Sequence, residues 1–264
     1  MLAEAREDKP AIVLTVRDAD GAIVRHVGGS VEAGFHRVAW DLRYPLLEPW
    51  IPPAERQPRY WEPAGVLAAP GQYSVQLQRR IDGRLEPIGE PRPFTLRPVR
   101  EPTLAGLPQA ERVAFLRRAD ELKRAIAGTV KAIDELKVQT GAIKESLGNA
   151  SAEPALYERT QRLEQQAQKL RDRLVENPAR AQMGYRGPVP IQHRAEIAAL
   201  GPRWNAHGPT ATQRDSLAIA ERGFAEVGAA VDRLIDEDYA RLRRDLDAAG
   251  VPWTPGRGVP VPDS

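Results

Sequence analysis

Residues 108–148 repeat mostly apolar positions at alternating spacings of four and three, and this pattern constrains the fold more than any other feature of the chain. Such spacing places the residues on one stripe of an α-helix, as in a coiled-coil seam. At about 1.5 Å per residue the seam would run for roughly 50 Å. A stripe of that length needs partners to cover it. The seam consists of Phe115, Ala119, Leu122, Ile126, Thr129, Ile133, Leu136, Thr140, Ile143 and Leu147.

Two later segments carry the same repeat. One comprises Leu156, Thr160, Leu163, Ala167, Leu170 and Leu174, and the other comprises Leu217, Ala220, Phe224, Val227, Val231 and Leu234. Because the first two seams are separated by a short turn, they can cover each other at little entropic cost. We therefore expect an antiparallel, coiled-coil-like bundle of three helices within one chain, and self-assembly through the seams is the alternative.

Helix-end signals delimit these segments. Gly148 with Asn149 ends the first helix, Ser151 can cap the second, and Thr210 with Gln213 forms a capping box for the third. Residues 176–209 form a crossover rich in glycine and proline, with a short helix expected at 191–200. The bundle is thus predicted over residues 101–264, including a C-terminal tail.

The first hundred residues alternate apolar and polar positions as strands do. Residues 12–16 and 22–27 flank a turn at Asp18–Gly21 and predict a hairpin. Further strands are expected at 36–40, at 70–77 and, after a turn at Asp82-Gly83, at 94–96. Short alternating strands of this kind predict an antiparallel, Ig-like β-sandwich over residues 1–100. The expected fold class is therefore α+β with two domains.

A long insertion at residues 44–69 interrupts the strand pattern. It is rich in proline and carries Trp50, Tyr60 and Trp61. These rings could form a platform for a sugar ring or a partner, or they could pack the loop onto the sandwich or onto the helices, which is the interpretation we favour. They are the candidate contact residues of the chain.

No pattern in the sequence predicts catalysis. The chain has no cysteine, and its four histidines are scattered without the spacing of a metal site. Nucleophile, phosphate-binding and dinucleotide motifs are absent from the sequence, so we expect no cofactor and no metal. The acidic run at 236–238 is followed within a turn by Arg241, Arg243 and Arg244; it could bind a cation, but the interpretation we favour is a surface ladder of ion pairs.

Charge and hydropathy limit the partners. A net charge of only +2 provides no field to gather phosphate and disfavours nucleic acid. No run approaches the roughly 18 apolar residues that a membrane span requires. The charged start, residues 1–10, lacks the apolar core of a signal peptide, so we expect none in this chain.

Three motifs together resemble the Ig-like module of the flagellar hook-capping type. They are residues 20–25 (DGAIVR), 34–43 (GFHRVAWDLR) and 70–77 (PGQYSVQL). Followed by a helical bundle that ends in 249–256 (AGVPWTPG), they resemble the C-terminal region of bacterial sortilin-like, BNR-repeat propeller proteins, which are often labelled glycosyl hydrolases.

The resemblance implies structural roles for Trp40 and Asp41, with Tyr73 in the same module, and export of full-length relatives to the periplasm or the cell exterior. It does not carry the hydrolase label, because the chain contains no propeller blade and no Asp-box motif. We therefore expect a non-catalytic binding or scaffolding module with a BNR-type propeller as partner. An accessory carbohydrate-binding or glycoside-hydrolase-associated protein is the alternative, besides the self-assembling coiled coil.

Overall fold

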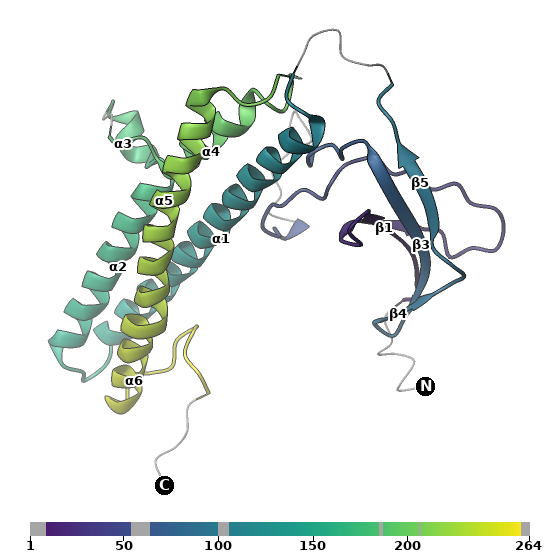
Figure 1. Ribbon diagram of the computed structural model, residues 1–264. Helices are drawn as coiled ribbons and strands as arrows, with labels where there is room; N and C mark the ends of the chain where they lie inside the picture. The colour runs from purple at the N-terminus through teal and green to yellow at the C-terminus, as the bar shows by residue number, and fades with distance from the viewer. Residues whose placement is uncertain (1–8, 54–63, 100–105, 185–186, 206, 260–264) are drawn as a thin grey trace, which may run out of the picture. The chain divides into compact units, whose positions relative to one another are not determined.

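A computed structural model describes residues 9–53, 64–99, 106–184, 187–205 and 207–259. An antiparallel sheet of five strands comes first and helices follow (Figure 1). Internal contacts group the chain into two units, one of residues 1–47, 51–118 and 202–208, and the other of residues 48–50, 119–201 and 209–264. The predicted division at residue 100 stays a prediction.

The sheet is built around one hairpin and one long strand. Strands β1 (Ala11–Asp18) and β2 (Ile23–Gly29) form the hairpin predicted at the Asp18–Gly21 turn. The Asp18 carboxylate accepts the backbone N–H groups of Asp20 and Ala22, and Gly21 adopts a positive φ of 80°. The turn chemistry read from the sequence is therefore the chemistry that closes the hairpin.

Strand β3 (Gly71–Ile81) pairs along its length with β1. Its other edge is covered in two parts, by β5 (Arg92–Leu96) next to residues 71–75 and by β4 (Arg84–Pro87) next to residues 78–81. Asp82 and Gly83 both have positive φ, the requirement of a tight two-residue turn between β3 and β4. The proline-rich segment after this turn therefore forms two short strands, β4 and β5, which pair with different parts of β3.

The strand predicted at residues 36–40 is not formed, and that prediction is wrong. Leu42 takes a left-handed conformation with φ of 59°, and Asp41 closes a turn by accepting the N–H of Arg43 at 3.0 Å. The segment therefore bends where a strand would continue. The strands among the described residues form one sheet, so a second sheet, which a sandwich requires, is not confirmed.

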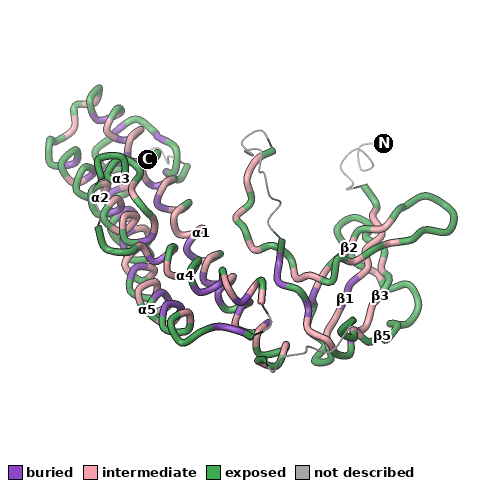
Figure 2. Tube along the Cα trace, turned by 90° about the horizontal axis from the view of Figure 1, so that it is seen from above, coloured by how far each residue is buried: buried purple, intermediate pink, exposed green. Residues whose placement is uncertain are grey.

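Most residues of the three helical seams are buried (Figure 2), and Leu170 and Phe224 of the second and third seams are half-buried. In α1 (Gln109–Gly148) every seam residue is buried except Phe115 and Thr129, which are half-buried. Helix α2 (Pro154–Leu174) starts after Glu153 with Pro154 in its first turn, so the prediction of Ser151 as its cap is wrong. Short helices α3 (Pro178–Gln182) and α4 (Ile191–Leu200) follow, and α4 is the helix expected in the crossover. None of the described helices is long and apolar enough to cross a membrane.

Polar contacts between helices fix their directions. Asp134 and Lys137 of α1 contact Arg171 and Gln168 of α2, so residue numbers rise on one helix as they fall on the other. Arg173 of α2 pairs with Glu226 of α5 (Ala211–Arg233) and Arg159 of α2 pairs with Asp245, so the residue numbers again run in opposite directions. These neighbouring helices are therefore antiparallel. The predicted capping box of Thr210 and Gln213 opens α5.

Helix α5 continues without a break through a π-helical turn, η3 (Leu234–Tyr239), into α6 (Ala240–Ala248). Leu234 and Tyr239 are both buried although they are five positions apart. A π turn accommodates one residue more than an α turn, so it returns Tyr239 and then Leu242 to the buried face. The skip in the apolar spacing after Leu234 explains this local structure.

Candidate functional site

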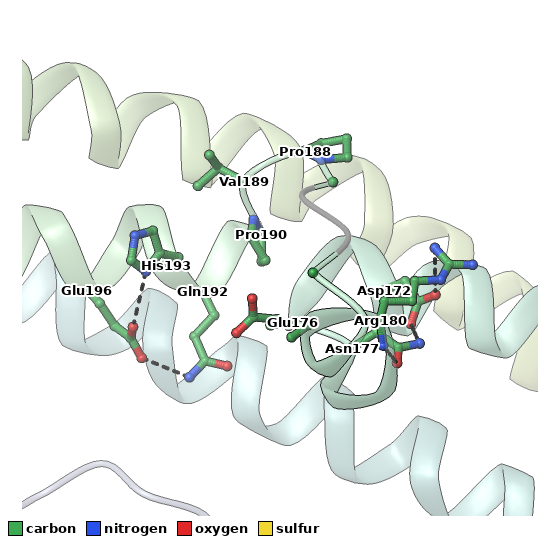
Figure 3. A pocket seen from close by; sticks show the side chains of 13 residues that line it. Asp172, Glu176, Asn177, Arg180, Pro188, Val189, Pro190, Gln192, His193 and Glu196 are labelled. Atoms are coloured by element: carbon green, nitrogen blue, oxygen red, sulfur yellow. Dashed lines mark hydrogen bonds and ion pairs between the residues drawn. The ribbon is translucent and has the colours of Figure 1, made fainter.

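The crossover between α2 and α4 forms a pocket of about 720 Å³. Its walls are the end of α2, the short helix α3, the segment 187–190 and the start of α4 (Figure 3). We call it the crossover pocket. Its charged and polar lining comes from Asp172, Glu176, Asn177, Arg180, Gln192, His193 and Glu196.

Local sequence explains why the chain turns here. Asn177 is the N-cap of α3, and its side-chain oxygen accepts the N–H groups of Ala179 at 3.2 Å and Arg180 at 3.4 Å. Pro178 occupies the first helical position, where its missing N–H removes no hydrogen bond. Gly184 follows α3 with φ of 72°, which a residue with a side chain rarely adopts. A cap and a glycine thus limit α3 to one short turn.

On the α2 side of the pocket, Asp172 is held by three donors. Its carboxylate accepts from Gln168 Nε2 at 2.6 Å and from Asn177 Nδ2 at 3.1 Å, and it pairs with Arg180 Nη1 at 3.6 Å. The Asp172 side chain is only 17% exposed. A carboxylate with several fixed donors serves to hold the wall in place.

On the α4 side, Glu196 accepts from Gln192 Nε2 at 2.8 Å, and one of its oxygens lies 3.9 Å from His193 Nδ1. Figure 3 shows Glu176 between this wall and the α2 wall. The Glu176 carboxylate has no hydrogen-bond partner among the described residues. Among the described lining residues it is the carboxylate that no other side chain holds, and it is exposed.

The described lining is acidic, with three carboxylates against the single guanidinium of Arg180. Such a pocket favours a cationic or hydrogen-bond-donating group over an anion. The carboxylates do not converge as metal ligands do, since no three His, Asp or Glu side chains of the described chain gather in that way.

The predicted contact residues lie elsewhere. Trp50 is 75% exposed. Tyr60 and Trp61 lie outside the described residues. The stem of the insertion is ordered by backbone pairing, with Tyr44 N–H donating to Val66 O at 2.9 Å and Ala68 N–H donating to Leu42 O at 2.7 Å. The base of this loop is thus packed by its own backbone, and Trp50 is not part of that packing.

Trp40, Asp41 and Tyr73 are brought together at the sheet. The ring centroid of Trp40 lies 5.9 Å from that of Tyr73 and 6.3 Å from that of Phe94, and Tyr73 stacks on Phe94 at 5.8 Å. Asp41 forms the turn that follows Trp40. The Tyr73 hydroxyl donates to Ala69 O at 2.7 Å. Trp40, Tyr73 and Phe94 thus form a packed aromatic cluster, and Asp41 shapes the turn beside it.

The pKa of Tyr73 reflects its position in this cluster. Burial raises the pKa of Tyr73 above its ordinary value, and the nearby Tyr44 and Asp18 raise it further. Its hydroxyl therefore stays protonated and keeps donating to Ala69. Tyr73 anchors the sheet to the base of the insertion.

Sequence reasoning missed the crossover pocket. Asn177 and Pro178 were recognisable only as a helix end, and the lining residues follow no periodic spacing. Their meeting depends on the antiparallel return of the chain and on the short α3. The sequence carries only a weak signal for such a pocket, namely a long crossover with several acidic and amide side chains.

No family model, no curated protein and no solved structure matches this chain. The resemblance to sortilin-like BNR-repeat proteins therefore stays a prediction.

Proposed function

We propose that this chain is a non-catalytic binding and scaffolding module that recognises a basic group of a partner protein in the crossover pocket. The observation that carries the proposal is the position of Glu176, whose unpaired carboxylate stands between two braced walls of a pocket of about 720 Å³. A pocket of this size with a few fixed polar groups is typical of a binding site.

The braced walls support binding without reorganisation. Asp172 and Glu196 are held by neighbouring side chains before any ligand arrives. Holding these groups in advance lowers the entropic penalty of association. The long helices supply the rigid support, since their apolar seams are buried in the chain itself.

The finer architecture belongs to the same proposal. The sheet with its Trp40, Tyr73 and Phe94 cluster would be the core of an Ig-like sandwich, and α1, α2 and the α5–η3–α6 helix would close a three-helix, coiled-coil-like bundle. The resemblance to BNR-repeat proteins makes a propeller domain the first partner to test.

The test measures binding of a purified BNR-type propeller domain by calorimetry, with Glu176→Gln as the variant. We expect binding by the unchanged chain and an affinity lower by about tenfold in the variant, the effect of losing one charged hydrogen bond of about 1.4 kcal/mol. Glu158→Gln, an exposed change on α2, is the control. Absence of binding, or an equal affinity in both variants, contradicts the proposal.

A carbohydrate-binding role is the second candidate, and the exposure of Trp50 favours it. An indole that is 75% exposed can stack on a sugar ring. A glycan panel should then show binding that Trp50→Ala removes, whereas Trp204→Ala, at an equally exposed tryptophan (81%), leaves it unchanged. A panel without binding, or loss in both variants, eliminates this candidate.

A further inference from the structure

Residues 249–259, which we call the strap, follow α6 and contact α1 and α6: Ser146 of α1 donates to Pro252 O at 3.2 Å, and Arg257 pairs with Asp247 of α6. Val251, Thr254 and Arg257 of the strap are buried. Arg257 donates to the carbonyls of Val251 at 3.0 Å and Pro252 at 2.8 Å and pairs with Asp247 of α6. The strap is therefore fixed by a buried guanidinium.

Three buried side-chain atoms near the strap lack a hydrogen-bond partner among the described residues. They are Tyr239 Oη, Arg243 Nε and Thr254 Oγ1. Tyr239 and Thr254 are each only 4% exposed. Leaving a buried donor without a partner costs about 1–3 kcal/mol of stability, so these three atoms are candidates for contact with a bound group.

The contacts of Arg243 connect Tyr239 with the strap. Its guanidinium carbon lies 5.2 Å from the centroid of the Tyr239 ring. Its Nη1 donates at 3.0 Å to the carbonyl of Gly256, two residues after Thr254. The π turn η3 brings Tyr239 to this face. The strap and the end of the long helix thus contribute to the same region.

The chemistry of the group favours negative charge. Arg243 Nε can only donate, and the hydroxyls of Tyr239 and Thr254 can both donate. Burial raises the pKa of Tyr239, outweighing Arg243 and Arg257, which lower it, so the phenol keeps its proton. Arg257 is neutralised by Asp247, whereas Arg243 has no carboxylate partner in the described part of the chain.

We propose that Tyr239, Arg243 and Thr254 form a binding site for a small inorganic anion, which fastens the strap to the helices. The site is separate from the crossover pocket and does not depend on the function proposed for it. The anion accepts the three unpaired donors and balances the charge of Arg243. Chloride and phosphate share this chemistry.

The test follows thermal unfolding of the full chain by circular dichroism in sodium chloride, sodium phosphate or sodium gluconate at equal ionic strength. Gluconate is too bulky for a buried site and reports general screening. We expect a saturable rise in Tm of about 2–4 °C with chloride or phosphate over gluconate. Tyr239→Phe and Thr254→Val, which keep size and shape, should lose this rise.

Arg243 is left unchanged because it also holds Gly256, and its loss would disturb the strap itself. Tyr157→Phe, at a half-exposed tyrosine of α2, is the matched control and should keep the rise. Three results would overturn the proposal. The first is a rise in Tm with gluconate as large as that with chloride or phosphate, and the second is a rise in Tyr239→Phe and Thr254→Val as large as in the unchanged chain. The third is no rise in the unchanged chain with either anion. In the last case water alone occupies the site.

Discussion

The indole nitrogen of Trp40 donates a hydrogen bond to the carbonyl oxygen of Arg43 at 3.0 Å, within a turn that Asp41 closes. Trp40 therefore packs against the sheet from a bent segment that makes no strand pairing with it. Its ring lies against Tyr73 and Phe94. The residue predicted to be structural occupies a packed position although the strand predicted around it is absent.

Replacing Trp40 should destabilise the N-terminal sheet. Trp40→Ala removes the ring contacts with Tyr73 and Phe94, and we expect a loss of roughly 3 kcal/mol in the free energy of unfolding. Urea denaturation followed by far-UV circular dichroism measures it. Trp204→Ala, at an exposed tryptophan, is the control and should change stability by less than about 0.5 kcal/mol. An unaltered midpoint for Trp40→Ala would argue against its packing role.

Alkaline pH should destabilise the sheet through Tyr73. Its pKa is raised in the folded chain above the ordinary value of about 10, so the unfolded chain releases the phenolic proton first. The stabilising contribution is fully present below pH 10 and is lost as pH rises from there through the folded pKa. Tyr73→Phe should flatten the fall in stability above pH 10, as measured by denaturation at pH 9 and pH 11. Parallel curves for both proteins would show that Tyr73 does not cause it.

Periodicity and turn chemistry explain which parts of the fold the sequence predicts. The seam of α1 is visible because one face of a long helix must be apolar wherever its partners come from. The turns at Asp18–Gly21 and Asp82-Gly83 are visible because positive φ requires particular residues. These features depend on residues that are close in the sequence, so the sequence alone is sufficient to predict them.

Features that depend on distant parts of the chain were not predictable. The alternation of His36, Val38 and Trp40 resembles a strand, but an antiparallel bridge between Arg43 and Leu67 sets the path of the chain just beyond it. The crossover pocket depends on the return of α4 past the end of α2. The π turn had a local signal, the five-residue step from Leu234 to Tyr239, which a search for unbroken heptads passes over.

The seam of α1 should dominate the stability of the helical part. Ile133 is fully buried at a seam position, so Ile133→Ala leaves a cavity and should lower the free energy of unfolding by about 2–5 kcal/mol. Val138→Ala, on the exposed face of the same helix, should change it by less than about 0.5 kcal/mol. Chemical denaturation compares the two. Similar losses for both would mean that the heptad assignment does not describe the buried face.

Burial of the seams within one chain predicts a monomer. Thr140, Thr160 and Ala167 are fully buried, which leaves these seam positions unavailable to a second copy. Light scattering should therefore give a molar mass near 29.2 kDa that does not change with concentration. A molar mass that rises with concentration would instead support the alternative of a self-assembling coiled coil.

The pair of Asp247 and Arg257 should hold the strap more strongly than a surface pair would. Only 3% of the Arg257 side chain is exposed, so Asp247→Ala leaves a buried guanidinium without its counter-charge. We expect a loss of about 3 kcal/mol in stability and faster proteolysis after Arg257. Glu121→Ala breaks the exposed pair with Arg124 and should lose no more than about 0.5 kcal/mol. Equal effects in denaturation and limited trypsin digestion would show that the strap is fastened by its backbone contacts alone.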